Sequence, residues 1–308
     1  MKYIVLFLIV GICIACVVYT HLRGKVRHKF VRQLSDHSTF MAPINCFMYA
    51  FSAIPNRPYA NLDDFPELKK FRDNWETIRA EALALASEGA IKASEKYDDA
   101  GFNSFFRRGW KRFYLKWYGD YHESAKQYCP KTIEMIESIP SIKAAMFTQL
   151  SPGSQLVKHR DPYAGSLRYH LGIITPNSDD CAIDVDGELY SWRDGDDVLF
   201  DETYIHYAYN KTDDDRIIFF CDVERPMKFG FATLINRFFG KIAMAAAASP
   251  NDDTDKTGFI NKAFKYVYGI RRIGKALKKK NKPLYHLTKW LLILGGLGLL
   301  IWAYIAIF

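Results

Sequence analysis

The chain has 308 residues, of which 49% are hydrophobic and 25% are charged, proportions that suit a folded protein with some membrane-embedded sequence. Its formal net charge is +8, but 15 of its 42 Lys and Arg residues are concentrated beside two apolar ends, and the remaining 27 are outnumbered by 34 Asp and Glu residues. A nucleic-acid-binding protein is expected to carry a basic stripe on its folded body, so this distribution argues against a nucleic-acid partner.

Both ends of the chain carry apolar segments of membrane-spanning length. Residues 290–308 form an uncharged run of 19 residues, close to the roughly 20 that a helix needs to cross a hydrocarbon core. The N-terminal run, 3–19, has 17 residues, and a cleaved signal peptide is the alternative. A signal peptide carries its positive charge before the apolar run, whereas here only Lys2 precedes it and a basic cluster follows it. We therefore expect transmembrane anchors at 1–20 and 290–308.

Basic residues flank each apolar segment on one side only. Five Lys or Arg residues follow the first segment, and ten precede the second. By the positive-inside rule, both segments place the intervening chain in the cytoplasm, in a two-pass topology. The basic collars, within 21–62 and 249–289, either lie at an anionic membrane surface or serve only to set this topology.

The first part of the body is expected to be helical after an irregular start. Residues 34–62 contain three prolines and are predicted to be an irregular linker lying over the domain. From 65 to 94, apolar residues recur at spacings of three and four, which predicts one or two amphipathic helices. A short helix is expected at 130–141. Together, 63–141 would form the helical part of a catalytic domain that spans 63–248.

The stretch from Phe102 to Gly119 interleaves five basic residues with eight aromatic ones. One interpretation is a substrate groove in which aromatic rings contact acyl chains and cations bind phosphates. The other is an aromatic strand or hairpin with a solvated basic face. The substrate-binding candidates in the first interpretation are Arg107, Arg108, Lys111 and Arg112.

From residue 142 onward the pattern becomes that of β-structure. Short apolar or alternating runs bounded by turn signals predict a jelly roll of about eight strands at 142–226. Asp186-Gly187, between two such runs, is a strong two-residue hairpin signal. The following residues, 227–248, are predicted to form an amphipathic helix that lies on the bilayer.

Four residues at the predicted strand edges suggest a metal site. His159 and Asp161 are two residues apart, so in extended chain their side chains point the same way, and His206 follows a later strand. Two imidazoles and one carboxylate on one face of a metal leave positions open for a keto acid and O₂, as in non-haem Fe(II) oxygenases. Arg216, ten residues after His206, could grip the far carboxylate of that keto acid with its planar guanidinium.

A second pair of polar residues shares one face of the strand that follows the first two ligands. Alternation places Arg168 and His170 together, opposite three apolar residues. They point either into the barrel lumen, toward the metal, or to solvent. We favour the lumen because the strand comes directly after the proposed ligands.

The segments SPGSQLVKHRD, LRYHLGI, VLFDETYIHYAYN and RIIFFCDVERP, between residues 144 and 226, together resemble the aspartyl/asparaginyl β-hydroxylase family of 2-oxoglutarate dioxygenases. The resemblance implies a mainly β catalytic core, a double-stranded β-helix or jelly roll, with flanking α-helices. It implies Fe(II), 2-oxoglutarate as co-substrate, and O₂. The residues that it implies are His159, Asp161 and His206 for the metal, and Arg216, His170 and Thr148 for 2-oxoglutarate.

Two further features of the resemblance concern single residues. Arg168 occupies a position that in the peptide hydroxylases contacts the substrate carboxylate. Some animal members have glycine where Asp161 stands, so this chain departs from them and keeps an ordinary set of three ligands. The departure weakens the transfer of substrate detail from those members.

With apolar helices at both ends and a basic collar, the whole chain looks like the LpxO-type lipid A hydroxylases of Gram-negative inner membranes. That likeness implies hydroxylation at C2 of a secondary acyl chain of lipid A, or of a related membrane lipid, at the cytoplasmic face of a bacterial inner membrane, with release of succinate and CO₂. Two alternatives stay open. One is an aspartyl/asparaginyl protein hydroxylase, and the other is a non-catalytic membrane adaptor that binds lipid phosphate.

Overall fold

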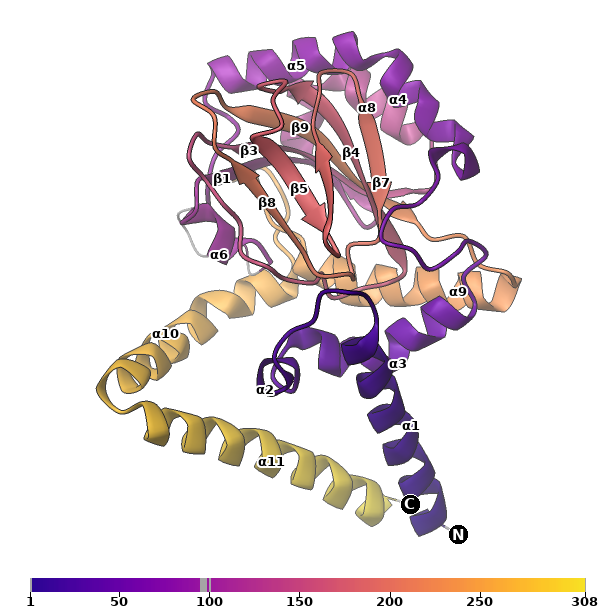
Figure 1. The fold of residues 1–308 in the computed structure, drawn as a ribbon, viewed down its shortest axis with the longest axis vertical. Helices are drawn as coiled ribbons and strands as arrows, with labels where there is room; N and C mark the ends of the chain where they lie inside the picture. Colours follow the sequence, from indigo (N-terminus) through magenta and orange to yellow (C-terminus); the bar gives the residue numbers. More distant parts are fainter. Residues whose placement is uncertain (1, 95–98, 100, 308) are drawn as a thin grey trace.

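The computed structural model describes residues 2–94, 99 and 101–307, and its centre is a pair of antiparallel sheets (Figure 1). The larger sheet has the strand order β2-β1-β3-β9-β4-β7, and the smaller has the order β6-β5-β8. The strands are β1 (Trp110–Trp117), β2 (Asp120–Tyr121), β3 (Ile142–Leu150), β4 (Ser166–Ile174), β5 (Cys181–Val185), β6 (Glu188–Ser191), β7 (Asp197–Phe200), β8 (His206–Asn210) and β9 (Arg216–Glu224).

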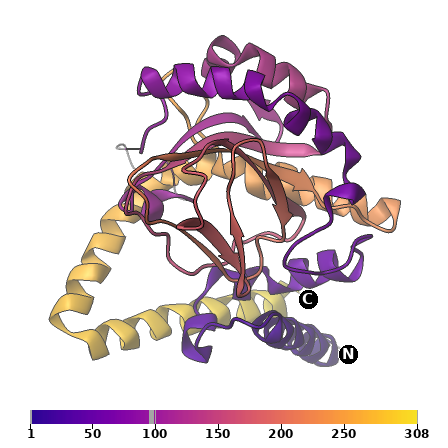
Figure 2. The same ribbon diagram turned by 45° about the horizontal axis from the view of Figure 1, so that its top comes forward.

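This β-rich, jelly-roll-like core with flanking helices agrees with the predicted architecture. The strands of the two sheets curve around a common interior (Figure 2). The α-helices are α1 (Lys2–Leu22), α2 (Phe30–Gln33), α3 (His37–Ala50), α4 (Lys69–Asp73), α5 (Trp75–Ser87), α6 (Asn103–Phe106), α7 (Glu123–Tyr128), α8 (Pro130–Glu137), α9 (Gly230–Phe239), α10 (Phe259–Lys280) and α11 (Lys282–Ile307).

Strand alternation separates two buried regions. On β4, Leu167, Tyr169 and Leu171 belong to a hydrophobic cluster that also contains side chains of α4, α5 and α8, the helices that cover the outer face of the larger sheet (Figure 1). Arg168 and His170 point to the opposite, inner face and line a cavity between the sheets. The lumen orientation predicted for these two residues is therefore confirmed.

The predicted hairpin at Asp186-Gly187 is confirmed. It joins β5 to β6, with Val185 paired to Glu188. The φ angles are +57° at Asp186 and +89° at Gly187, so both central residues are in the left-handed region that a two-residue hairpin turn requires. Asp tolerates this conformation better than most residues, and Gly adopts it without a steric penalty.

The amphipathic stretch 65–94 forms two helices, α4 and α5, preceded by short 3₁₀ turns. Phe71, Ile78 and Leu85 form part of their buried face, as the spacing predicted. The helix predicted at 130–141 is α8, which begins with Pro130 in its first turn, where the missing N–H has no helical partner.

The prediction of an irregular linker at 34–62 is wrong for its first half. The 14-residue helix α3 lies there, capped by Asp36, whose side chain accepts a hydrogen bond from Ser38 N. Pro43 removes one helical hydrogen bond, but the buried side chains of Asn45 and Tyr49 bond to other parts of the domain. These tertiary contacts outweigh the local cost of the proline.

The predicted amphipathic helix at 227–248 is shorter than expected. It is regular only in α9, after which Gly240–Met244 form a π-helical turn. On α9, Phe231, Leu234 and Phe238 are exposed, whereas Asn236 is buried and bonds to the backbone of Gly165. The helix therefore presents an apolar face away from the domain.

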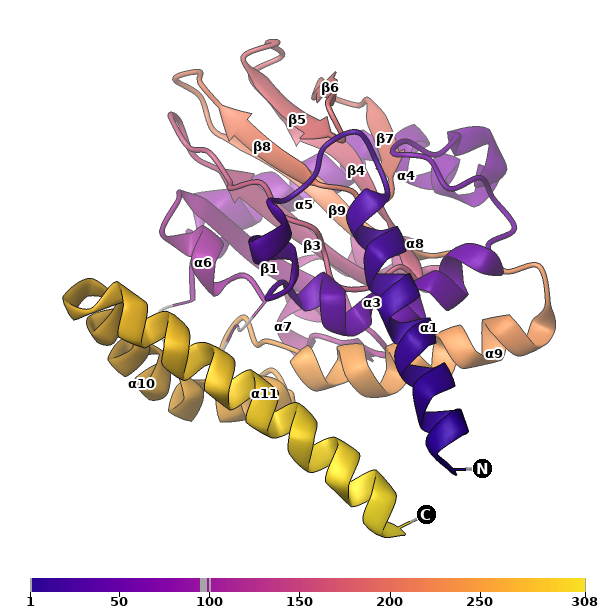
Figure 3. The ribbon, with the colours of Figure 1, turned by 60° about the horizontal axis from the view of Figure 1, so that its bottom comes forward.

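Within the part of the chain that the structure describes, two helices are long and apolar enough to cross a membrane: Ile4–Leu22 within α1 and Lys282–Ala306 within α11. Their side chains are almost entirely unburied by the rest of the protein. Both helices project from the same side of the β core, and the two chain ends lie on that side (Figures 1 and 3). This arrangement is consistent with a membrane-associated protein.

Candidate metal centre

The predicted ligands His159, Asp161 and His206 come together. Their ligand atoms all lie within 4.8 Å of one another. The backbones of His159 and His206 pair through two hydrogen bonds, of 3.0 and 2.9 Å, which set the two imidazoles side by side. A further bond of 2.9 Å from Asp161 N to Glu202 O joins the same two loops.

Backbone carbonyls orient both imidazoles. Nδ1 of His159 lies 2.7 Å from Val157 O, and Nδ1 of His206 lies 3.0 Å from Tyr204 O. A carbonyl accepts only, so each Nδ1 carries the proton and each Nε2 keeps its lone pair. Metal-binding histidines are commonly held by such a bond on the other ring nitrogen.

The electrostatic environment keeps the three donors unprotonated at neutral pH. Burial, together with the neighbouring His159, lowers the pKa of His206 to about 3, and burial also lowers the pKa of His159. Burial works against ionisation of Asp161, but Arg168 and the two imidazoles lower its pKa to about 2. Two neutral imidazoles and one carboxylate fit Fe(II) binding.

Next to this cluster, the cavity contains buried polar atoms that have no hydrogen-bond partner among the described residues. Its lining includes the three metal-ligand candidates as well as Thr148, His170, Trp192 and Arg216. The atoms without a partner are Thr148 Oγ1, both ring nitrogens of His170, Trp192 Nε1, and Arg216 Nε and Nη2. Buried polar groups are normally paired, so a group of unpaired donors around one cavity marks a place for a polar ligand.

Arg216 is a cation in this cavity with no carboxylate beside it in the described structure. It is 2% exposed, and its guanidinium lies 4.5 Å from the centre of the Trp192 ring. Burial lowers its pKa to about 10, which still leaves it charged at neutral pH. Burial, with Arg168 and Arg216 nearby, holds the pKa of His170 well below its ordinary value, so this imidazole is neutral. The set fits a carboxylate of a small ligand.

Arg168 lies among three carboxyl groups at the wall of the cavity. Its Nη2 forms ion pairs with Asp161, at 2.9 Å, and with Glu202, and its Nε bonds to Asp222 at 2.9 Å. The guanidinium also lies 3.8 Å from the Phe220 ring centre. A contact with substrate stays a prediction, and in this structure Arg168 holds the metal-ligand candidate Asp161.

The basic residues of the stretch 102–119 do not line the cavity. Arg112 is buried and pairs with Asp99 at 3.1 Å, while Arg107 is exposed and donates to Tyr268 Oη at 2.5 Å. Arg108 and Lys111 also lie outside the cavity lining. Three aromatic residues of the stretch 102–119 do line the cavity: Phe102, Phe105 and Trp110. The ring centre of Phe105 is 4.8 Å from that of His159.

Sequence reasoning missed Trp192, Glu202 and Asp222. Trp192 covers Arg216, and the two carboxylates fix Arg168. Glu202 and Asp222 stand in segments that the sequence resemblance already singled out, but nothing local distinguishes them from surface acids. Trp192 lies just past the end of β6, and no local signal indicates that it turns into the lumen.

The fold and the cluster define a β-rich, jelly-roll-like protein with two histidines and one carboxylate placed so that they could hold a metal ion. A family model described as aspartyl/asparaginyl beta-hydroxylase matches residues 72–226, half of the chain, and the chain belongs to that family. The matched region contains all three metal-ligand candidates and Arg216, and it excludes both apolar ends.

Two curated relatives and one solved structure add detail. Over 182 residues the chain is 34% identical to the ornithine lipid ester-linked acyl 2-hydroxylase of Rhizobium tropici, in an alignment covering 58% of this chain and 64% of the relative. It is 29% identical over 164 residues to the aspartyl/asparaginyl beta-hydroxylase of Homo sapiens, covering 52% of this chain and 21% of that protein. The chain thus spans less than two thirds of either relative. A prolyl-4-hydroxylase structure from Pseudomonas putida aligns with 49% of this chain and 88% of its own, at 16% identity and a TM-score of 0.33.

Proposed function

We propose that the protein is an Fe(II)/2-oxoglutarate-dependent dioxygenase that hydroxylates an acyl chain of a membrane lipid. The main support for the proposal is that one cavity contains both the cluster of His159, Asp161 and His206 and the unpaired donors around Arg216. The metal-binding cluster alone would suit several chemistries. The buried, unpaired cation beside it is what favours a dicarboxylate co-substrate.

In this proposal Fe(II) is held by the two Nε2 atoms and the Asp161 carboxylate. With 2-oxoglutarate and O₂ it supplies an oxidising chemistry that converts a C–H bond into C–OH, while 2-oxoglutarate becomes succinate and CO₂. Arg216 binds the distal carboxylate of 2-oxoglutarate, and Thr148 and His170 supply further hydrogen bonds. The Trp192 ring covers Arg216 and excludes water from this ion pair, which strengthens it.

The aromatic side chains at the cavity suit an apolar substrate. Phe102, Phe105 and Trp110 line the cavity, the Phe105 ring lies against that of His159, and the basic residues of the same stretch lie outside the cavity lining. The name of the Rhizobium tropici relative favours C2 of an ester-linked acyl chain as the site of hydroxylation. Lipid A is the specific substrate that we propose, with related acylated lipids, ornithine lipid included, as close alternatives.

The two apolar helices and the exposed face of α9 support a membrane location. We propose a two-pass protein of a bacterial inner membrane whose catalytic domain is cytoplasmic, with α9 and the basic collars at the anionic lipid surface. Such a location suits a substrate that never leaves the bilayer.

Mass spectrometry of lipids from cells expressing the protein tests this function. Wild type should add one oxygen to an acyl chain of lipid A, and the His159→Ala and Arg216→Ala variants should not, at equal protein level. Lys111→Ala, which removes a cation outside the cavity, is the matched control and should behave as wild type. If oxygen were added to ornithine lipid alone, the proposed reaction would stand and the proposed substrate would be ornithine lipid in place of lipid A.

A second candidate is an aspartyl/asparaginyl protein hydroxylase, which the human relative's name favours. Acyl chains left unmodified under aerobic, iron-replete conditions, together with oxygen added to Asp or Asn of a protein, would establish it. Activity retained by all variants would show that the cavity is not the active site. Loss of the metal ligands without any phenotype would favour the non-catalytic adaptor.

A further inference from the structure

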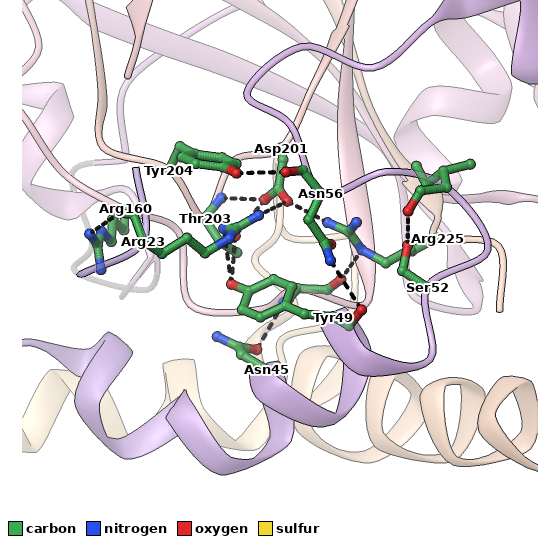
Figure 4. Close-up of polar contacts among 12 residues, drawn as sticks. Arg23, Asn45, Tyr49, Ser52, Asn56, Arg160, Asp201, Thr203, Tyr204 and Arg225 are labelled. Atoms are coloured by element: carbon green, nitrogen blue, oxygen red, sulfur yellow. Dashed lines mark hydrogen bonds and ion pairs between the residues drawn. The ribbon is translucent and has the colours of Figure 1, made fainter. Parts of the chain in front are cut away.

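The C-terminal end of α1 and the residues that follow it pack against the loops that carry the metal-ligand candidates. We call residues 20–26 the junction segment (Figure 4). Its Arg23 is 8% exposed, and the guanidinium lies 4.0 Å from the ring centre of Tyr49 and 3.8 Å from that of Tyr204. A collar cation at a membrane surface would contact lipid headgroups, whereas the Arg23 side chain is buried inside the protein.

Arg23 binds the loop that leads to His206. Its Nη2 lies 2.5 Å from Asp201 Oδ2, and its Nη1 donates to Thr203 Oγ1 at 2.7 Å. Asp201 also pairs with Arg225 at 2.7 Å, and all of these side chains are buried. Burial works against ionisation of Asp201, but the two guanidinium groups keep its pKa well below the usual range.

The other ligand loop reaches back to the same helix. Arg160 stands between His159 and Asp161 and is 2% exposed. It donates through Nη1 to Thr20 O at 2.5 Å and through Nη2 to Arg23 O at 3.4 Å. These carbonyls belong to the end of α1, where helical carbonyls lack partners and a cation is favourable.

A third contact joins the junction segment to the hairpin between β5 and β6. Asp186 accepts hydrogen bonds from Lys25 N at 2.9 Å and Val26 N at 2.8 Å, and its own N–H donates to the carbonyl of Ile205, the residue before His206. Gly24 has φ +86°, and a Cβ there would lie 2.5 Å from Asp186 Oδ1. Only glycine fits this close approach.

We propose that the junction segment is a positioning element of the metal centre. It bonds to Arg160 in the loop of His159 and Asp161. It also bonds to Asp201 in the loop before His206 and to Asp186, which bonds to that loop. These contacts fix the two loops relative to each other. The first apolar helix is then part of the site's framework as well as an anchor. The segment lies outside the region matched by the family model. The inference rests on the proposed function in that the cluster binds a divalent metal.

Arg23 and Arg27 provide a matched pair for the test. Both are cations of the same collar, but Arg27 is exposed. In full-length protein in detergent, Co(II) binding is measured by its absorption spectrum for wild type, Arg23→Ala and Arg27→Ala. We expect Arg23→Ala to weaken Co(II) binding by about 10- to 100-fold, as loss of groups that support metal ligands commonly does. Arg27→Ala should bind as wild type. Equal affinities for the three proteins would overturn the proposal.

Hydrogen exchange gives a readout that needs no metal. The N–H groups of Asp161 and His206 bond across the two loops, to Glu202 O and His159 O. In metal-free protein these two amides should exchange faster in Arg23→Ala than in wild type or Arg27→Ala. Wild type that binds no Co(II) would refute the metal site, and the exchange rates alone would then decide whether the segment positions the loops.

Gly24→Ala keeps the test valid if Arg23→Ala does not fold. It removes no charge, yet its methyl group clashes with Asp186 and detaches that contact. Weaker Co(II) binding in Gly24→Ala, with folding preserved, supports the proposal, and wild-type affinity and exchange contradict it. His159→Ala is the negative control for Co(II) binding.

Discussion

Two arginines line the same cavity in opposite electrostatic environments. Arg168 is surrounded by Asp161, Glu202 and Asp222, three carboxylates for one guanidinium. Arg216 has no carboxylate partner among the described residues, and two of its nitrogens are buried without a hydrogen bond. Both side chains are almost fully buried.

In the proposed function, the difference separates a cation that holds the fold together from one that binds a ligand. The wall around Arg168 holds three carboxyl groups for one guanidinium, and burial raises the pKa of Glu202 well above its usual value even though Arg168 opposes this. We therefore expect the protein to need Arg168 for a stable fold. The wall around Arg216 lacks negative charge, which a dicarboxylate would supply.

The largest expected effect is on stability, from Arg168→Met. Removing one partner of a buried ion pair commonly costs about 3–5 kcal/mol of unfolding free energy, because the remaining charges stay buried and unpaired. Chemical unfolding in detergent measures the change. Arg216→Met is the matched control, since it alters a cation without a protein partner, and it should leave stability unchanged or increase it. Equal destabilisation by both substitutions would contradict the distinction.

The next effect is on the co-substrate, from the same Arg216→Met variant. Loss of a bidentate charged contact worth roughly 3 kcal/mol should raise KM for 2-oxoglutarate by about 100-fold. Steady-state kinetics in 2-oxoglutarate measures it, with KM for Fe(II) as the internal control. A change confined to KM for the lipid would mean that Arg216 contacts substrate instead.

A smaller effect is expected from Trp192→Phe. The substitution removes Nε1, whose hydrogen bond is worth about 0.5–1.5 kcal/mol, and keeps an aromatic ring beside Arg216. KM for 2-oxoglutarate should rise by roughly 3- to 10-fold, while unfolding free energy changes little. An unchanged KM would show that Trp192 serves only to fill the space beside Arg216.

The smallest effect concerns pH. The pKa of His206 is lowered to about 3, so this ligand stays neutral above that value and protons compete with metal only as the pH falls toward it. Burial also lowers the pKa of His159, so Co(II) affinity should fall much less between pH 7 and pH 5 than it would with histidines of ordinary pKa. A steep fall beginning near pH 6.5, the ordinary value for histidine, would mean that the site is open to water.

The sequence predicted those features that depend on local pattern. Alternation on β4 placed Arg168 and His170 in the lumen, and the Asp186-Gly187 turn needed only its two residues. The cluster of His159, Asp161 and His206 could be inferred because two ligands stand two residues apart in the chain and the third stands at the start of β8.

The features that failed depend on contacts between distant residues. Helix α3 is held by contacts such as that of Tyr49 with Thr203, 154 residues away. The local pattern contains only the proline, which favours an irregular linker. Arg23 was grouped with the collar because its partner Asp201 lies 178 residues along the chain. The sequence of 102–119 does not indicate that its aromatic residues line the cavity while its basic residues lie outside it. That difference depends on the fold, which turns Phe105 toward the cavity.

The unpaired donors around Arg216 have a consequence for the lifetime of the protein. A ligand that satisfies them binds the native state and not the unfolded chain, and at 100 times its dissociation constant it adds about 2.7 kcal/mol to the free energy of unfolding. In a cell short of the keto acid, each copy would persist in its least stable form and be exposed to proteases. The supply of this metabolite would then regulate how much of the protein accumulates, as well as how fast it turns over.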